Sequence, residues 1–473
     1  MVSRVLMVSS EAIPLAKTGG LADVVGSLPA ALREFRDETA VVIPRYGSID
    51  LKGIRRVYDS LPVFLARVRY DTSIYQAPEE FPLYLVDCPQ LFDRSGFYGD
   101  GGGDYPDNHI RFAVIARAAL GVARFLFRTE IFHCHDWQSG LVPVYLKTTY
   151  ASDPTFLGTR TLFTIHNLGY QGLFPRSALA DTGLDPAVYR PDGLEFYGNV
   201  SYLKAGIAFA DAINTVSPTY AREIQTPEYG FGMDGALRAR AGVLTGILNG
   251  VDYRDWSPEV DRYTPARYSA DKLDGKAVCK EQLLLEFGLP LDAMNRPLIG
   301  IVARFTRQKG ADLIAEVAGD IIAENVYLAA LGTGEPEYED FFRRLAAQFP
   351  GRVAIQIGFD NGLAHRIEAG ADIFLMPSRY EPSGLNQMYS LRYGTVPVVR
   401  ATGGLDDTIE EGTGFKFKEY AGQALLGAVR TAVRAYSDPP SWREMMRRGM
   451  QKDFSWKTSA AAYSALYRRL LGG

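Results

Sequence analysis

Short apolar runs alternate with amphipathic segments along the whole chain. The runs are too short for buried helices and are bounded by turn residues, so they predict buried strands separated by helices. This alternation predicts two α/β domains, each with a parallel sheet. The predicted strands are 5–8, 40–43, 83–86, 131–134, 161–165 and 212–215 in the first half, and 298–302, 326–331, 353–357, 373–376 and 396–399 in the second.

The two series are separated by a segment rich in Pro, Tyr and Asp that has no clean periodicity and ends near residue 270. We place the boundary near Gly246, with a first domain over 1–245 and a second over 246–455. Apolar residues recur at helical spacing over 456–471. This last helix either packs back on the first domain or is a plain terminal helix.

Composition is ordinary for a soluble globular protein, with 47% hydrophobic and 22% charged residues among 473. A net charge of −4 argues against a general nucleic-acid binder. Cys88, Cys134 and Cys279 are too few and too scattered for a disulfide framework or a four-cysteine zinc site. We therefore expect a reducing cytoplasm, and the chain has no charge-free apolar stretch that predicts a membrane span.

Candidate chemistry begins at Glu381, which follows the strand 373–376 and precedes a helix opened by Gly384. Open α/β sheets bind ligands at the carboxyl ends of their strands. The next strand is followed by Thr402, Gly403 and Gly404, where we expect a helix whose free N–H groups face an anion.

Two further loops carry cations. Gly19 and Gly20 follow the first strand and let the backbone approach a ligand, while Lys17 adds positive charge; a tight turn with a solvated lysine is the equal alternative. Arg304 and Lys309 follow the strand 298–302 and together suit a diphosphate, although a lone basic loop is often only solvated surface.

The segment 332–336 lacks the third glycine of a dinucleotide fingerprint, and Pro336 is expected to interrupt the following helix. It therefore predicts a turn beside a nucleotide rather than a hydride-transfer site. Asp136 and His166 end two strands of the first half and could hydrogen-bond a polyol; a structural histidine with its partners inside the protein is the alternative for His166. Tyr98, Trp137 and Tyr170 could stack on sugars or merely pack. No metal site is expected, because His133 and Cys134 point to opposite faces of a strand.

Taken together, these motifs closely resemble the bacterial glycogen synthase and plant starch synthase family. The resemblance runs in order through the whole chain. It rests on Lys17-Thr18-Gly19-Gly20-Leu21-Ala22-Asp23, His133-Cys134-His135-Asp136-Trp137, His166-Asn167-Leu168-Gly169-Tyr170-Gln171-Gly172, Gly246-Ile247-Leu248-Asn249-Gly250-Val251-Asp252, the loop 304–310 and Glu381-Pro382-Ser383-Gly384-Leu385.

The resemblance implies a GT-B architecture, in which two Rossmann-like, doubly wound domains face each other across a deep cleft. It implies transfer of glucose from ADP-glucose to the non-reducing end of an α-1,4-glucan, such as glycogen or a maltooligosaccharide, with retention of configuration. Neither a metal nor an organic cofactor is expected, and neither nucleic acid nor a membrane is an expected partner.

The resemblance also implies roles for individual residues. Glu381, His166, Lys17, Arg304, Lys309 and Asp136 would be catalytic. The nucleotide sugar would be bound by Lys17, Gly19, Gly20, Asp23, Asn249, Arg304, Lys309, Phe359, Tyr380, Gly384, Leu385, Thr402, Gly403 and Gly404. The sugar and acceptor would be bound by Tyr98, Trp137, His166, Asn167 and Tyr170.

Two positions depart from the family pattern: Ser383 stands where Cys is common, and Phe359 where Tyr is common near the base. The missing tyrosyl hydroxyl could change the base preference, so a UDP-glucose-preferring synthase is one alternative. A non-catalytic glucan-binding or regulatory relative is another. A glucan phosphorylase would need a Schiff-base lysine and pyridoxal phosphate, for which no motif is present.

Overall fold

The computed structural model describes residues 2–101 and 103–472. Met1, with which the predicted first domain begins, lies outside this part, as do Gly102 and Gly473. Internal contacts divide the chain into two units: unit 1 is Met1–Val216, Ala221–Gly250 and Trp456–Gly473, and unit 2 is Ser217–Tyr220 and Val251–Ser455. Residues 246–250 thus lie in unit 1 rather than in the second domain.

Unit 1 is built on a sheet whose described part has nine strands, in the order β14-β13-β9-β8-β1-β2-β7-β6-β3. The strands from β14 to β7 are parallel, and β6 and β3 continue the sheet antiparallel. The bounds are β1 (Arg4–Val8), β2 (Glu38–Pro44), β3 (Arg55–Tyr58), β6 (Ser73–Ala77), β7 (Leu83–Asp87), β8 (Ile131–His135), β9 (Arg160–Ile165), β13 (Ala212–Thr215) and β14 (Leu244–Gly246).

Helices cover this sheet, because its central strands are apolar on both faces and must be buried on both. They are α1 (Gly20–Leu32), α2 (Pro89–Phe92), α3 (Asn108–Phe125), α4 (Asp136–Ser139), α5 (Leu141–Lys147), α6 (Ala178–Thr182), α7 (Tyr202–Phe209), α9 (Asp234–Ala239) and α18 (Trp456–Leu470), with short 3₁₀ turns at Arg33–Phe35, Pro154–Phe156, Pro186–Val188 and Ala241–Val243. Two small antiparallel sheets are added, β4 (Val63–Leu65) with β5 (Val68–Tyr70), and β10 (Leu173–Pro175), β12 (Asn199–Ser201) and β11 (Glu195–Phe196).

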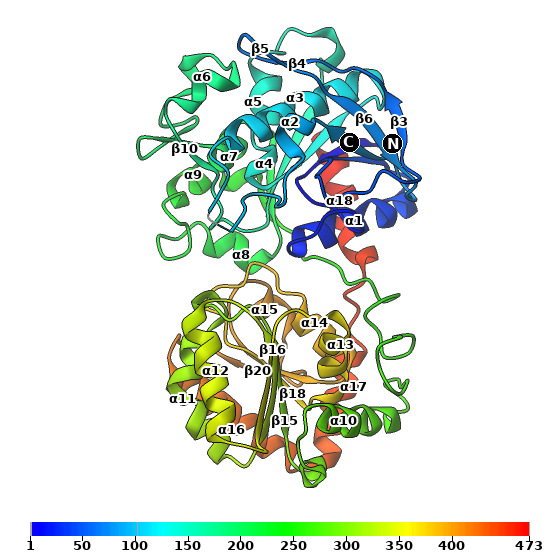
Figure 1. Ribbon diagram of the computed structural model, residues 1–473, viewed down its shortest axis with the longest axis vertical. Coiled ribbons are helices and arrows are strands. Elements are labelled where there is room, and N and C mark those ends of the chain that lie inside the picture. Colours follow the sequence, from blue (N-terminus) through cyan, green and yellow to red (C-terminus); the bar gives the residue numbers. More distant parts are fainter. Residues whose placement is uncertain (1, 102, 473) are drawn as a thin grey trace. The chain divides into compact units, whose positions relative to one another are not determined.

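The C-terminal helix α18 is part of unit 1 and lies beside α1 (Figure 1). Its Tyr467 hydroxyl lies 2.8 Å from Nδ1 of His133, and its Tyr463 hydroxyl accepts a hydrogen bond from Asn214 at 3.0 Å. Tyr463 and Tyr467 are fully buried. Polar contacts to residues within β8 and β13 therefore fix the position of this helix, in addition to its apolar face.

Unit 2 contains a sheet whose described part has six parallel strands, in the order β17-β16-β15-β18-β19-β20. Numbered within the unit, this is the order 3-2-1-4-5-6 of a dinucleotide-type doubly wound domain. The bounds are β15 (Leu298–Val302), β16 (Tyr327–Gly332), β17 (Val353–Ile357), β18 (Ile373–Met376), β19 (Val396–Arg400) and β20 (Phe415–Phe417).

Two helical layers enclose the sheet of unit 2. Figure 1 shows α11, α12 and α16 on one side and α10, α13 and α14 on the other. Each layer has its own apolar core, around Val317 and Leu425 on one side and around Leu283 and Ile367 on the other. The helices are α10 (Asp274–Glu286), α11 (Ala311–Ala323), α12 (Pro336–Gln348), α13 (Asn361–Gly370), α14 (Asn386–Arg392), α15 (Gly403–Thr408), α16 (Gly422–Tyr436) and α17 (Pro439–Met450); α8 (Pro218–Glu223) begins in unit 2, and 3₁₀ turns lie at Leu291–Asn295 and Arg307–Lys309.

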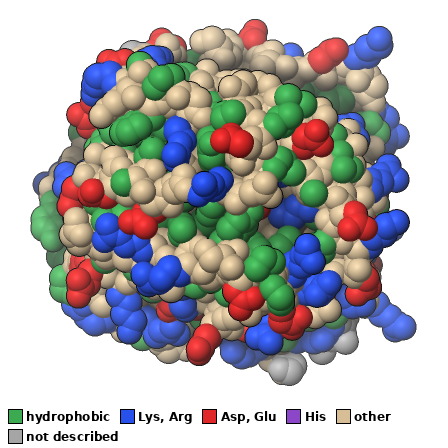
Figure 2. Space-filling view, turned by 90° about the horizontal axis from the view of Figure 1, so that it is seen from below, with side chains coloured by type: hydrophobic (Ala, Val, Ile, Leu, Met, Phe, Trp, Pro, Cys, Tyr) green, Lys and Arg blue, Asp and Glu red, His purple; other side chains and the backbone are tan. Residues whose placement is uncertain are grey.

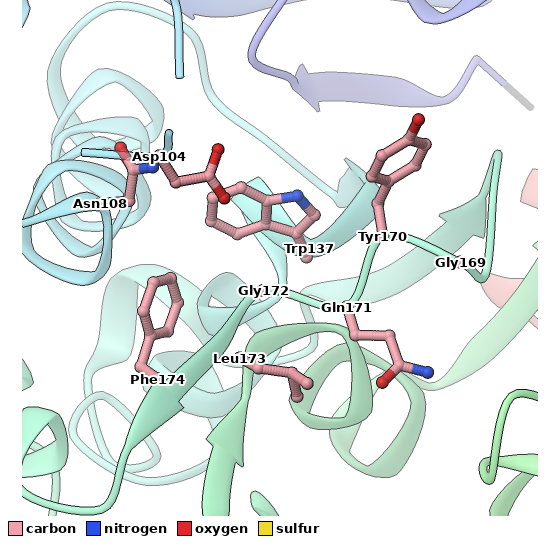
Figure 3. Close-up of a pocket in the computed structure, with 9 residues that line it drawn as sticks. All are labelled: Asp104, Asn108, Trp137, Gly169, Tyr170, Gln171, Gly172, Leu173 and Phe174. Atoms are coloured by element: carbon pink, nitrogen blue, oxygen red, sulfur yellow. The ribbon is translucent and has the colours of Figure 1, made fainter. Parts of the chain in front are cut away.

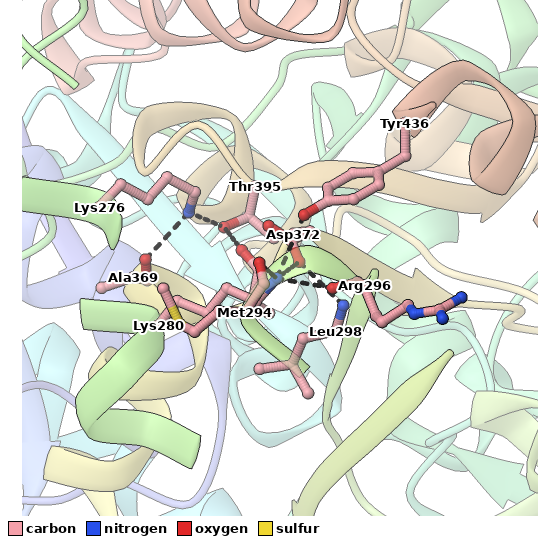
Figure 4. Close-up of polar contacts among 10 residues, drawn as sticks. Lys276, Lys280, Met294, Arg296, Leu298, Ala369, Asp372, Thr395 and Tyr436 are labelled. Carbon is pink, nitrogen blue, oxygen red and sulfur yellow. Dashed lines mark hydrogen bonds and ion pairs between the residues drawn. The ribbon is translucent and has the colours of Figure 1, made fainter. Parts of the chain in front are cut away.

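Two buried lysines anchor α10 to this sheet (Figure 4). Lys280 donates to Asp372 Oδ2 at 2.7 Å and to the carbonyl of Arg296 at 2.7 Å. One turn earlier, Lys276 donates to Thr395 Oγ1 at 2.7 Å, and burial lowers the pKa of its ammonium to about 8. Lysines of one helix thus bind carbonyl, carboxylate and hydroxyl oxygens just before the N-terminal ends of three central strands.

The predicted strands are confirmed, with ends that differ by one or two residues. The prediction for Pro336 was wrong: it does not interrupt a helix but begins α12, where the missing N–H and fixed φ of proline are well tolerated. The antiparallel strands β3 to β6 were not predicted, because they are short and partly exposed.

On the face drawn in Figure 2, Lys and Arg side chains are interspersed with Asp and Glu among apolar and neutral ones. Such mixing agrees with a net charge of only −4. Among the helices of the described residues, we find none with both the length and the apolar composition needed to span a bilayer. The three cysteines are buried and free.

Candidate functional site

The loop of Lys17 follows β1, and the loop of Arg304 and Lys309 follows β15; these are the strands at which the order of each sheet reverses. In unit 1, β1 lies between β2 and β8, and in unit 2, β15 lies between β16 and β18. A crevice forms at such a switch point because the neighbouring crossovers run to opposite faces. Each unit therefore has one candidate ligand-binding site, at the carboxyl ends of its central strands.

In unit 1, the loop between β1 and α1 is held by a buried carboxylate. Glu11 is 3% exposed and accepts hydrogen bonds from the backbone N–H and the hydroxyl of Thr18, the latter at 2.6 Å. It also accepts one from the hydroxyl of Tyr98 at 2.5 Å. Lys17 is half exposed and pairs with Asp23 at 2.7 Å. Glu11 thus fixes the loop from its buried side. Lys17 lies at the surface, close in sequence to Gly19 and Gly20 at the start of α1.

Asp136 and His166 follow two neighbouring strands, β8 and β9. Oδ1 of Asp136 accepts a hydrogen bond from the backbone N–H of His166 at 2.7 Å. Asp136 has a φ of +54°, a conformation that residues other than glycine rarely adopt and that is concentrated at functional sites. The structure therefore brings these two predicted residues together.

Burial raises the pKa of the Asp136 carboxyl to about 7, and the nearby charge of Glu11 adds to the shift. The backbone N–H groups of His166 and Asn167 oppose it by stabilising the carboxylate. A carboxyl group with a pKa near 7 at the carboxyl end of a strand is typical of functional sites.

His166 is neutral at physiological pH, because burial lowers its pKa to about 3. Its Nε2 lies 2.9 Å from Nδ1 of His135, so one ring nitrogen is engaged within the protein. Burial also lowers the pKa of His135 and His133. Both ring nitrogens of His133 are engaged in the core, by Thr164 and Tyr467, so His133 is not part of the candidate site.

A pocket of about 280 Å³ lies next to this pair (Figure 3). It is lined by Asp104, Asn108, Trp137 and residues 169–174. Tyr170 is 54% exposed, as expected for a ring that can stack on a ligand. Trp137 is 8% exposed, and a Cβ on Gly172 would come within 2.5 Å of its ring, so one indole face is covered by backbone. Trp137 therefore mainly packs in the core and offers only part of its ring to the pocket.

In unit 2, the predicted carboxylate and cation form a direct pair. Lys309 Nζ lies 2.5 Å from Oε2 of Glu381, which also accepts a hydrogen bond from Ser378 Oγ at 3.0 Å. Glu381 is 5% exposed. Arg304 lies in the same loop as Lys309 and is exposed. Its Nη2 lies 3.5 Å from Oε1 of Gln308. The carboxyl ends of β15 and β18 thus bring Lys309 and the buried Glu381 together, with Arg304 in the same loop as Lys309.

The loop after β19 packs tightly against the loop that carries Glu381. A Cβ on Gly404 would come within 1.9 Å of the carbonyl oxygen of Ser383, so only glycine fits. The backbone N–H of Gly404 donates to the carbonyls of Glu381 and Pro382 at 3.1 and 3.2 Å. The expectation of free N–H groups was therefore wrong at Gly404, whose amide is used to join two loops; Gly403 and Thr402 are buried beside it.

Other predicted residues lie around these sites. Phe359 is 88% exposed after β17, whereas Tyr380 is partly buried after β18. Asn249, in unit 1, is 6% exposed, and its Oδ1 has no hydrogen-bond partner within the described residues. Gly384 and Leu385 precede α14 and are partly buried.

Sequence reasoning missed Glu11, Ser378 and the polar lining of the pocket, Asp104, Asn108 and Gln171. Glu11 lies only six residues before Lys17, and a carboxylate that close to a glycine-rich loop is a signal that could have been used. Gln171 lies within the motif 166–172, whose sequence gives its glycine and aromatic residues more weight than its amide, whereas Asp104 and Asn108 come from a separate segment that no local pattern relates to it.

Comparisons with known proteins agree with this geometry. Residues 4–239 match the family model "Starch synthase catalytic domain", and residues 290–449 match "Glycosyl transferases group 1". The glycogen synthase of Koribacter versatilis (strain Ellin345) is 49% identical over 470 residues, covering 98% of this chain and 97% of that protein. That of Anaeromyxobacter dehalogenans (strain 2CP-C) is 52% identical over 477 residues, covering 99% of each.

Among solved structures, the catalytic domain of starch synthase IV from Arabidopsis thaliana, bound to ADP and acarbose, is similar with a TM-score of 0.92 and 32% identity over 100% of both chains. Sucrose-phosphate synthase from Thermosynechococcus elongatus shares the fold, with a TM-score of 0.60 and 18% identity over 99% of each chain. The predicted GT-B class with two Rossmann-like domains is confirmed by these similarities. The chain belongs to the family of glycogen and starch synthases.

Proposed function

We propose that this protein is a glycogen synthase that transfers glucose from ADP-glucose to the 4-hydroxyl at the non-reducing end of an α-1,4-glucan, with retention of configuration. The observation that carries the proposal is the contact of Lys309 with the buried Glu381 at the switch point of unit 2. In the transfer, the acceptor oxygen bonds to C1 of glucose as the bond from C1 to the diphosphate breaks. The acceptor proton leaves with the diphosphate.

Under this proposal, Lys17, Arg304 and Lys309 bind the diphosphate and stabilise the negative charge that grows on it. Gly19 and Gly20 allow its close approach, and Asp23 holds Lys17. Glu381 binds glucose hydroxyls and stabilises positive charge at C1. Fixed charges near the reacting bond act mainly on the transition state, because their positions need no rearrangement during the reaction.

The acceptor side is assigned to unit 1. His166, neutral at working pH, hydrogen-bonds a sugar hydroxyl through the nitrogen that His135 does not use. Asp136 and Asn167 bind further hydroxyls, and Tyr170 stacks on a sugar ring. Tyr98 acts mainly by orienting Glu11 and the loop of Lys17.

We further propose that no metal or organic cofactor is required, because cationic side chains supply the charge that a metal would otherwise provide. Transfer should therefore persist in excess EDTA, and loss of transfer that Mg²⁺ restores would refute this point. The cytoplasm is the proposed compartment, since buried free thiols suit a reducing environment.

The proposal of ADP-glucose as donor rests on the family and on the similar catalytic domain of starch synthase IV, which is bound to ADP. Phe359 would lie near the base and, without a hydroxyl, contribute an apolar surface to it. The alternative is a synthase that prefers UDP-glucose.

The deciding experiment incubates the purified protein with maltotetraose and either ADP-glucose or UDP-glucose, without added metal, and follows product masses. Stepwise gain of hexose with ADP-glucose supports the proposal. Gain only with UDP-glucose retains the transfer and refutes the donor. Absence of transfer with either donor, together with retained glucan binding, points to a binding or regulatory protein.

A further inference from the structure

The hairpin formed by β11 and β12 has an unusual residue in its turn. Phe196 pairs with Asn199, which leaves Tyr197 and Gly198 as a two-residue loop. Their φ values are +49° and +83°. Positive φ at both central residues defines a type I′ turn, in which Asn, Asp or Gly usually takes the first position. Tyrosine in this position is conformationally unfavourable.

A second turn nearby repeats this arrangement. Phe231 and Gly232 have φ values of +48° and +80°, and the N–H of Met233 donates to the carbonyl of Gly230 at 2.7 Å, closing a four-residue turn. Again an aromatic residue occupies the position that favours a small polar one. Bulky residues at positive φ are outliers, so two of them in one region call for a reason.

Burial does not supply that reason. The side chain of Tyr197 is 78% exposed and that of Phe231 is 40% exposed. The two turns adjoin each other, since a Cβ on Gly232 would lie 3.2 Å from a ring carbon of Tyr197. Phe196 supports the Tyr197 ring from the edge, with ring centres 4.8 Å apart. Two adjoining turns thus each carry an exposed aromatic residue; we call Tyr197 and Phe231 the outer aromatic pair.

The outer aromatic pair is joined to the pocket described above. Gln171, which lines the pocket, donates from Nε2 to the carbonyl oxygen of Phe231 at 3.0 Å. Figure 3 shows the side chain of Gln171 leaving the segment 169–172 in the direction opposite to Tyr170. A single side chain, Gln171, therefore both lines the pocket and bonds the turn that carries Phe231.

We propose that the outer aromatic pair is a glucan-binding subsite that holds sugar residues of the acceptor chain beyond those in the pocket. The C–H faces of glucose are apolar and stack on exposed aromatic rings, while neighbouring amide groups bind hydroxyls. The ligand is a linear α-1,4-glucan, long enough to extend from the pocket. This inference rests on the proposed function for the identity of the acceptor.

The test replaces each ring with a residue that suits the turn. Tyr197→Asn and Phe231→Asn, singly and together, keep a side chain that tolerates positive φ, so the thermal midpoint should not fall. Tyr197→Phe retains the ring. Phe64→Thr is the matched control, because Phe64 is an exposed aromatic in β4, away from the described pocket lining.

The readout is the ratio of KM for maltotriose to KM for maltoheptaose, with ADP-glucose as donor. We expect this ratio to fall about tenfold in the double variant, which corresponds to the loss of one or two stacking contacts. Tyr197→Phe and Phe64→Thr should keep the wild-type ratio. An unchanged ratio in the double variant overturns the inference.

Glycogen binding without donor, measured by affinity electrophoresis, separates this inference from the proposed function. If the wild-type protein transfers no glucose, the proposed function fails, yet weaker glycogen binding by the double variant still supports the subsite. If glycogen binding is unchanged and sedimentation shows that only the wild type self-associates, the pair is a contact between copies and the inference is overturned.

Discussion

Glu381 combines deep burial with a short contact to a cation, and the proposed stabilisation of positive charge at C1 depends on it. We expect Glu381→Ala to lower kcat by roughly 100-fold or more, because a charge fixed near C1 acts most strongly as positive charge develops there. Initial rates at saturating ADP-glucose measure this. Ser378→Ala is the matched control: it removes one neutral hydrogen bond to the same carboxylate, which contributes about 1 kcal/mol, so kcat should fall by about tenfold or less. A Glu381 variant with raised KM and normal kcat would contradict the assigned role.

Asp136 determines the expected pH dependence. Its pKa is raised to about 7, so the carboxylate form is lost as the pH falls through neutrality. If the carboxylate binds a sugar hydroxyl, kcat/KM should rise with pH and level off roughly one unit above that pKa. Asp136→Asn should lower kcat/KM and abolish this acidic limb.

Glu11→Gln provides a matched test of the cause. The charge of Glu11 contributes to the raised pKa of Asp136, so its removal should move the acidic limb to lower pH. If the acidic limb of the kcat/KM profile does not move in Glu11→Gln and persists in Asp136→Asn, another group is responsible for it.

At the level of elements, the position of α10 depends on two lysines rather than on apolar packing alone. Lys280 and Asp372 form a largely buried pair, with side chains 5% and 13% exposed. Lys280→Met should lower the free energy of unfolding by about 3–5 kcal/mol, because Asp372 is left without its cation. Urea denaturation measures this. Glu281→Gln, at an exposed position of the same helix, should change the free energy of unfolding by about 0.5 kcal/mol or less. Equal effects of the two substitutions would show that the ion pair has no special importance.

The elements also show why two sequence predictions at loops were wrong. The N–H of Gly404 was expected to be free because its helix begins after a strand, yet the adjacent loop brings two carbonyl groups to it. Pro336 was expected to interrupt a helix because proline disrupts helix interiors, yet it occupies the first turn. In both cases the outcome depended on where a helix begins, to within a residue or two.

At the scale of the whole molecule, unit 1 is completed by the C-terminal helix, which is distant from the rest of the unit in sequence. A chain that ends at Ser455 would lose the buried side chains of Trp456, Tyr463 and Tyr467. We expect such a chain to lose the cooperative unfolding of unit 1, seen by calorimetry, while unit 2 still unfolds. Lys457→Gln, at an exposed position of the same helix, is the control and should leave both transitions unchanged.

Tyr467→Phe tests the polar part of this contact. It leaves Nδ1 of His133 buried without its hydroxyl partner, which should cost about 1–3 kcal/mol. A truncated chain in which unit 1 unfolds as in the full protein would show that α18 is dispensable.

The sequence by itself determined the class of fold, most strands of the two parallel sheets and the loops that hold Lys17, Asp136, His166, Lys309 and Glu381. Buried parallel strands have a local apolar signature, and chemistry in such folds follows strand ends, so both could be predicted from neighbouring residues.

Only the tertiary structure decided which residues support those loops and which surfaces adjoin them. Tyr98 on Glu11, Lys280 on Asp372, Gly404 against Ser383 and the approach of Tyr197 to Gly232 all join segments that a local pattern does not relate. Such contacts depend on packing between distant parts of the chain, whereas strands and helices are largely specified by residues a few positions apart.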